Sequence, residues 1–358
     1  MTSGGEVRRS GPALATAERV RLVGQRLSEL RNVLSGHAGR AIVLDTRRDF
    51  AWLTVGGQNH VLASAETGVA PVVVTPDDAV VIAPVNEFDR LGAEEVDGLP
   101  LRLVSVPWWD RAAAEAAVTQ ISGGRDRVLR ASEIGVELEA LRTALDEHEH
   151  VRLEWLAGAA RHATADVLAA TRPGSTENEL AAGVVASLTA VAARVPVVLV
   201  ASDERIERFR HPLSSEKAIE RRVMVVVVAE RWGLHVAHTE FREFRERPPA
   251  LERRAAALAE VLTAMRGATQ PGNTLDDVLG AARAAYERTE MADEWTLHHQ
   301  GGTIGYQARE RVATPGDRTP IRVGMAFAWN PSAVGFKREE TLYLDAHGAR
   351  RILTTTPG

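Results

Sequence analysis

The stretch AFAWNPSAVGFKREETLYL, residues 326–344, predicts two strands joined by a turn. Apolar residues run up to Trp329, the pair Asn330 and Pro331 begins a turn, and strand-favouring residues resume after Glu339. A carboxamide therefore ends one strand and a carboxylate lies near the start of the next. The stretch is either an ordinary hairpin, with Asn330 capping the turn, or the floor of a binding site.

Around this hairpin, the C-terminal part of the chain predicts an α+β domain. Helical spacing of apolar residues covers a long tract over 136–171 and two later segments, 249–267 and 274–290. Apolar runs predict the strands PVVLVAS, VMVVVVAE, GLHVAHTEF, MAFAWNP and ETLYLD. Two helix starts, PGSTENEL and PGNTLDD, share Pro-Gly-x-Thr, which indicates an internal duplication.

The N-terminal part predicts a separate α/β domain. A helix over 16–35 comes first, and helices around EFDRLGAEEV and RAAAEAAVTQI would cover the sheet. Four apolar runs are expected as its strands: 41–45, 50–55, 70–75 and 79–85. The glycine- and charge-rich segment SGGRDRVLRASEIG breaks this pattern, so we place the domains at 1–128 and 129–358.

Composition excludes several classes of protein. The formal net charge of -5, from 43 basic and 48 acidic residues, argues against a nucleic-acid or membrane-surface partner. Cysteine is absent, which excludes disulfides, thiolate metal ligands and a cysteine nucleophile. The apolar run VMVVVV is too short to span a bilayer, and the first ten residues lack a signal-peptide core. We expect a cytoplasmic protein.

Five motifs resemble the pita-bread (M24) family, which includes methionine aminopeptidases, aminopeptidase P, prolidase, creatinase and ectoine hydrolase. They occur in the family's order: PGSTENEL, RFRHPLSSEKAIERRVMVVVVAERWGL, TEF, GGTIGY and WNP…GFKREET. The segment DFAWLTVGGQNHVLASAETGVAPVVVT is similar to the creatinase-type N-terminal domain. The resemblance implies an α/β N-terminal creatinase-type domain and an α+β pita-bread C-terminal domain with a curved antiparallel sheet.

The resemblance also implies that most metal ligands of this family are missing here. The peptidases hold two metal ions with two Asp, one His and two Glu. The first Asp falls near Val226, the second at Ala237, and the first Glu at Asn330, so that only the last one, Glu339, is kept. An uncharged amide is a poor metal ligand beside carboxylates. We therefore expect no metal and no cofactor.

The position of the ligand histidine depends on the alignment register. Laying GGTIG on the peptidase GHGIG places the ligand at Gly302, with Arg309 where a second histidine helps catalysis. Laying HHQGGTIGYQARE on the creatinase pattern places His298 there and matches Arg309–Glu310 to an Arg-Glu pair. The second register aligns more residues and is preferred.

Creatinase and ectoine hydrolase work without metal, and the resemblance implies catalytic roles for His211, His298 and Glu339. His211, in FRHPLSS, matches the histidine that handles the proton, a role that suits an imidazole. Its alternative is a loop histidine that caps a helix or faces water. Of His298 and His299, one is expected to face the site, the alternative being a histidine hydrogen-bonded in the core.

Three residues are candidates for substrate binding: His235, Asn330 and Arg309. His235 lies two residues before Ala237 on a strand, so both point to the same face, although an exposed strand histidine is the alternative. Arg309 could hold a carboxylate through its two-pronged guanidinium, or simply pair with Glu310.

The same hairpin contributes further polar groups to the expected site. Glu339 would receive an amine or guanidinium of the ligand, while Asn330 both donates and accepts. Lys337 is expected to be exposed to solvent rather than to bind a ligand.

Together these features predict a metal-independent, creatinase-like enzyme that cleaves or rearranges a C–N bond of a small amino-acid-like substrate. One alternative is a non-catalytic pseudopeptidase that binds a peptide or partner. A weaker one is a metallopeptidase with rearranged ligands such as His235, His298 and Glu339. In creatinase-like dimers the N-terminal domain closes over the partner's site, so we expect a homodimer in which Trp52 and the loop at 56–60 contribute.

Overall fold

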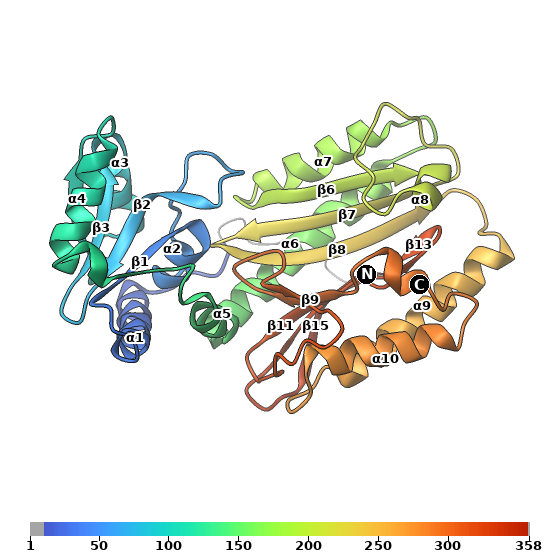
Figure 1. The fold of residues 1–358 in the computed structure, drawn as a ribbon. Helices are drawn as coiled ribbons and strands as arrows, with labels where there is room; N and C mark the ends of the chain where they lie inside the picture. Colours follow the sequence, from blue (N-terminus) through green and yellow to red (C-terminus); the bar gives the residue numbers. More distant parts are fainter. Residues whose placement is uncertain (1–10, 357–358) are drawn as a thin grey trace. The chain divides into compact units, whose positions relative to one another are not determined.

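The computed structural model describes residues 11–356, which form two compact units (Figure 1). One unit is Ala13–Arg142, and the other runs from Thr143 onward and includes residues 11 and 12. The division therefore lies after Arg142 rather than after residue 128. The reason is that β5, Val128–Arg130, pairs in parallel with β1, Ala41–Thr46, and so belongs to the N-terminal sheet.

The N-terminal unit is an α/β sheet of five strands in the order β4-β3-β2-β1-β5. The β1–β5 and β3–β4 pairs are parallel and the other two are antiparallel. Its remaining elements are α1 Thr16–Ser35, β2 Thr67–Val74, β3 Ala79–Pro84, α3 Val85–Arg90, η1 Leu91–Glu95, β4 Arg102–Val106, α4 Arg111–Ser122, η2 Arg125–Arg127 and α5 Gly135–Thr143.

The strand expected over 50–55 is wrong, because this run lies mostly in helix α2, Arg47–Leu53. The Thr46 side chain accepts a hydrogen bond from the Asp49 backbone N–H, and this N-cap starts the helix directly after β1. Apolar residues of α2 face the core on all sides, so their pattern lacks helical periodicity. Trp52 is one of these core residues.

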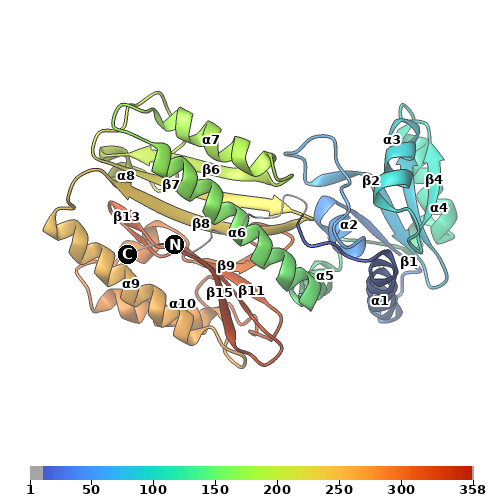
Figure 2. The same cartoon turned by 180° about the vertical axis from the view of Figure 1, so that it is seen from behind.

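The C-terminal unit contains two antiparallel sheets, β6-β7-β8 and β10-β9-β11-β14-β15, and the small hairpin β12-β13. Hydrogen bonds between Ala237 of β8 and Thr341 of β14 link the two sheets. Helices α6 and α7 cover the first sheet, and α9 and α10 pack on the second (Figure 2). The helices are α6 Glu147–Ala170, α7 Glu177–Thr189, α8 Glu204–Arg208, α9 Pro249–Ala268, α10 Leu275–Glu287 and the short η3 Glu294–Leu297. The strands are β6 Arg194–Ser202, β7 Arg222–Arg231, β8 Leu234–Glu243, β9 Gly301–Ile304, β10 Arg311–Val312, β11 Ala326–Trp329, β12 Ser332–Ala333, β13 Phe336–Lys337, β14 Glu340–Leu344 and β15 Arg350–Thr355.

The tract expected as helical over 136–171 is two helices, α5 and α6. Asp146 starts α6 with a capping box, in which its side chain and that of Glu149 each accept the other's backbone N–H. Within residues 11–356, no helix is both long and apolar enough to cross a membrane.

The two helix starts that suggested a duplication share the same geometry. Thr176 caps α7 and Thr274 caps α10, each in a capping box with an acidic residue three positions later. Each helix start also hydrogen-bonds a later segment of the chain, called here the returning segment. Gly174 N–H donates to the carbonyl of Ile219, and Gly272 N–H donates to that of Ile321. Each returning segment leads into a central strand, β7 or β11. The C-terminal unit thus consists of two halves built on one plan.

Candidate functional site

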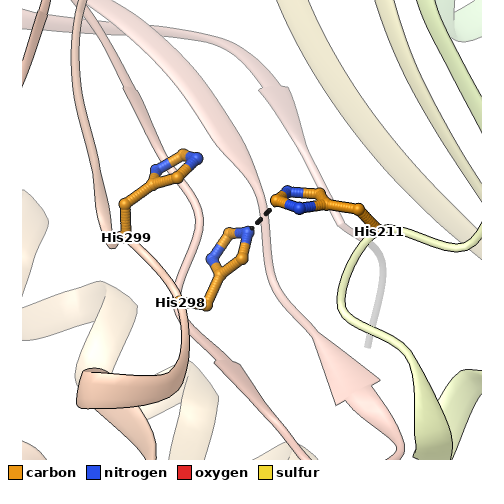
Figure 3. A group of neighbouring side chains, drawn as sticks. All are labelled: His211, His298 and His299. Atoms are coloured by element: carbon orange, nitrogen blue, oxygen red, sulfur yellow. Dashed lines mark hydrogen bonds between the residues drawn. The ribbon is translucent and has the colours of Figure 1, made fainter.

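Three imidazole rings lie together in the C-terminal unit (Figure 3). His211 comes from the loop between α8 and β7, while His298 and His299 come from the segment between η3 and β9. The Nε2 atoms of His211 and His298 are 3.0 Å apart, and the rings of His298 and His299 stack with centroids 4.4 Å apart. The structure therefore brings His211 and His298 together and adds His299.

The environment keeps these imidazoles neutral. Burial is the main cause that lowers the pKa of His298 to about 2 and that of His299 to about 4. The pKa of the more exposed His211 is also lowered, first by burial and then by the charge of Lys337. In the His211–His298 contact one neutral ring donates and the other accepts, so buried His298 can orient the exposed ring.

We expect the imidazoles of buried His298 and partly buried His299 to make stability depend on pH. The unfolded rings take up protons below about pH 6.5, whereas the folded rings stay neutral, so stability falls as the pH falls from about 6.5 to about 5. Urea unfolding should show that replacing His298 and His299 with Asn makes this decline shallower by about 1 kcal/mol per pH unit for each imidazole. The matched control, exposed His347→Asn, should keep the wild-type slope. Equal slopes in all three proteins would contradict the burial of neutral rings.

A buried ionic cluster lies beside the histidines. Glu339 is 2% exposed, and its Oε1 is 3.4 Å from Lys337 Nζ and 3.5 Å from Arg309 Nη2. The hydroxyl of Thr239 donates to its other oxygen at 2.5 Å. These partners lower the pKa of Glu339 against the opposing effect of its burial. The carboxylate is thus held by two cations of the chain itself.

The prediction that Lys337 is exposed to solvent is wrong. It is 7% exposed rather than solvent-facing, because the β12-β13 hairpin carries its side chain toward Glu339. Composition contained a signal for it: Lys217 and Lys337 are the only lysines among the 43 Lys and Arg residues. A chain that uses arginine almost everywhere retains a lysine inside this cluster.

The predicted substrate-binding residues differ in their surroundings. Asn330 is buried at the end of β11; its backbone N–H donates to Gln300, while its Oδ1 has no hydrogen-bond partner among residues 11–356. Arg309 likewise has no partner for its Nε in this part of the chain. His235 instead hydrogen-bonds the carbonyl of Gly305 through both its backbone N–H and its ring. Burial is the main cause that lowers its pKa.

The residues that the resemblance assigns to the family's metal positions do not fit a pair of metal ions. Val226 and Ala237 are buried and apolar, and the amide of Asn330 carries no charge. At Gly302 a Cβ atom would lie 1.9 Å from the Arg311 carbonyl oxygen, so this backbone has no room for an imidazole there.

The three imidazoles are the other group whose chemistry could suit a metal. Their ring nitrogens lie within 4.8 Å of one another, and three histidines can hold zinc. However, ligand imidazoles normally donate their second N–H to a partner, and the Nδ1 atoms of His298 and His299 have none in the described chain. The ammonium of Lys337 also acts on all three rings and would repel a cation.

Glu177, the first residue of α7, holds the loop that carries His211 through hydrogen bonds. This carboxylate is fully buried and accepts hydrogen bonds from the backbone and side chain of both Ser202 and Ser215, and from Arg205. Arg205 also donates to the carbonyl of Leu213, two residues after His211. Glu177 therefore positions the loop without reaching the site.

A small cavity of about 20 Å³ opens beside His298 and Lys337. Its apolar walls are formed by Ile206, Phe209, Met224 and Phe336. This space is sufficient for about one methyl group next to the polar cluster.

Comparison with known proteins agrees with this architecture. The sequence profile described as Metallopeptidase family M24 matches residues 154–352, more than half of the chain. No curated protein sequence matches. Solved structures that are similar include dipeptidase PepE from Mycobacterium ulcerans, with a TM-score of 0.78 and 20% identity over 97% of this chain and 98% of that one. The prolidase from Pyrococcus horikoshii OT3 has a TM-score of 0.75 and 16% identity over 93% and 99%. The N-terminal domain of FACT complex subunit SPT16 from Cicer arietinum has a TM-score of 0.70 and 14% identity over 94% and 95%. These similarities show the fold that the sequence predicted.

Proposed function

The chain belongs to metallopeptidase family M24, and from this premise we propose that it is a metal-independent, creatinase-like hydrolase that cleaves a C–N bond of a small amino-acid-like molecule. One observation carries the proposal: Glu339, the carboxylate kept from the family's metal site, is paired with Lys337 and Arg309. Two cations of the chain stand beside the carboxylate that serves metal ions in the peptidases. They supply positive charge in a buried site, where it stabilises negative charge on a substrate most strongly.

The histidine pair supplies the proton transfers. His211, the more exposed ring, takes a proton from water as the water oxygen forms a bond with the carbonyl carbon of the substrate. The C–N bond then breaks, and the imidazole returns the proton to the leaving nitrogen, which gives a carboxylic acid and an amine. His298 stays neutral and hydrogen-bonds this ring, so it orients the His211 imidazole, which can exchange protons with solvent.

The test of this proposal is turnover by metal-free protein. After dialysis against a chelator, we expect less than about 0.1 metal ion per chain by elemental mass spectrometry and an unchanged melting temperature. The same sample should release amine from at least one member of a panel of N-acyl amino acids and dipeptides. Near-stoichiometric metal whose removal abolishes turnover would overturn metal independence. Absence of turnover both with and without added metal would favour the pseudopeptidase alternative.

The homodimer, the contribution of the loop at 56–60 and the cytoplasmic location remain predictions. In that loop, the Asn59 side chain is hydrogen-bonded to both backbone groups of Ala70, so the loop has a defined conformation within its own unit.

A further inference from the structure

The buried ionic cluster has an unequal number of charges. Lys337 and Arg309 are two cationic side chains, and both are paired with a single carboxylate, Glu339. Burial lowers the pKa of Lys337, and Glu339 opposes this effect. Within residues 11–356, Glu339 and Arg309 are the charged groups that act on the pKa of Lys337, and Glu339 alone acts on that of Arg309. The neighbouring imidazoles are neutral near pH 7. With both side chains protonated, the cluster holds one more positive than negative charge in a region shielded from water.

A buried charge without a counter-charge is costly, and a ligand of opposite charge removes that cost. Among the described residues, one donor of the cluster is left for such a ligand, and a small space lies beside one of the two cations. Arg309 Nε has no partner in the described chain, and the small cavity opens beside Lys337 and His298. The same cluster offers nothing to a cationic group, because the oxygens of Glu339 are occupied by Lys337, Arg309 and Thr239.

We propose that the substrate carries one net negative charge: a small carboxylate, bound by Lys337 and Arg309, whose reacting nitrogen is acylated and therefore uncharged. This deepens the proposed function and rests on it. It also changes the role expected for Glu339, which orients two cations rather than receiving an amine of the substrate. Free amino acids and dipeptides bring an ammonium group that finds no carboxylate in the cluster. An N-acyl amino acid brings only the anion.

The experiment is isothermal titration calorimetry on the full chain, after chelation, at about pH 7.5 and low salt. The probes are N-acetylalanine, its uncharged primary amide and the zwitterion alanylalanine, because alanine has a side chain that matches the methyl-sized cavity. We expect N-acetylalanine to bind at least about 10-fold more tightly than either other probe. Lys337→Gln should abolish this preference, while Lys217→Gln, which changes the only other lysine, should leave it intact.

Three results would overturn the proposal: tighter binding of the zwitterion, a preference unaffected by Lys337→Gln, or no binding of N-acetylalanine at about 20 mM. The charge of Lys337 is checked separately by NMR of protein with ¹³C-labelled lysines. The chain has two lysines, so two side-chain signals are expected, and the Lys217→Gln variant assigns them. A neutral Lys337 near pH 7 would leave the cluster without excess charge and would overturn the proposal. These measurements require no turnover, so their failure is distinct from the finding of a catalytic metal.

Discussion

Replacing Glu339 with Gln is expected to lower the free energy of unfolding by about 3 to 5 kcal/mol. The variant keeps the size of the side chain but removes the carboxylate that pairs with both the buried Lys337 and the mostly buried Arg309. Breaking a buried ion pair on one side has a cost of this size, because the remaining charge stays away from water without compensation. Here two such charges remain. Urea unfolding at about pH 7 measures the loss.

The matched comparison is Lys337→Gln, which removes a charge from the opposite side of the same cluster. Arg309 and Glu339 then remain as a balanced pair, so we expect a change within about 1 kcal/mol of wild type. The double variant should be more stable than Glu339→Gln alone, since it contains one uncompensated cation fewer. A larger loss for Lys337→Gln than for Glu339→Gln would show that the lysine does not carry the excess charge.

Replacing Glu177 with Ala is expected to have a second large effect, about 3 kcal/mol of stability together with release of the loop that carries His211. The substitution leaves the backbone N–H groups and hydroxyls of Ser202 and Ser215 without their acceptor, and the Arg205 guanidinium without its counter-charge. Each buried donor that loses its partner costs about 1 to 3 kcal/mol, partly recovered when water enters. Urea unfolding reports the stability, and limited proteolysis reports cleavage within residues 209–221.

Glu179→Ala is the control for this variant, since it changes a carboxylate of the same helix start. Glu179 is exposed and completes the capping box of α7, so its loss should cost about 1 kcal/mol and leave the loop resistant to protease. Equal cleavage of the loop in both variants would mean that Glu177 acts only on the helix and not on the loop.

Much of the fold is predictable from local patterns. Long helices with an apolar stripe and strands with unbroken apolar runs were found where expected. Burial of one face gives a helix a period of about 3.6 residues, and burial of both faces gives a strand a short unbroken run. The run at 50–55 was wrong for the same reason. A short helix buried all round has no period, and only its N-cap residue, Thr46, distinguishes it from a strand. The unit boundary was displaced because pairing of β5 with β1 depends on tertiary contact.

The residues of the candidate site were harder to predict from the sequence than the fold. The proximity of His211 and His298 followed from motif order, which the resemblance supplied. Lys337 was misplaced because a charged residue beside a turn is usually exposed, and only its partner Glu339, brought close by the fold, makes its burial tolerable. The sequence placed Glu177 only within a helix start. Its local sequence does not indicate that five donors from two later segments bind its carboxylate.

The shared plan of the two halves bears on where new chemistry can arise in such a chain. In the first half, the connection between β6 and β7 carries His211. In the second half, the connection between β9 and β11 carries Arg309. An ancestral duplication would have given both connections the same starting sequence and the same place in their half. After such a duplication the two connections can diverge independently, so that one carries the His211 imidazole and the other the Arg309 guanidinium. The presence of both groups in one unit would then be a product of gene doubling rather than of a site assembled residue by residue.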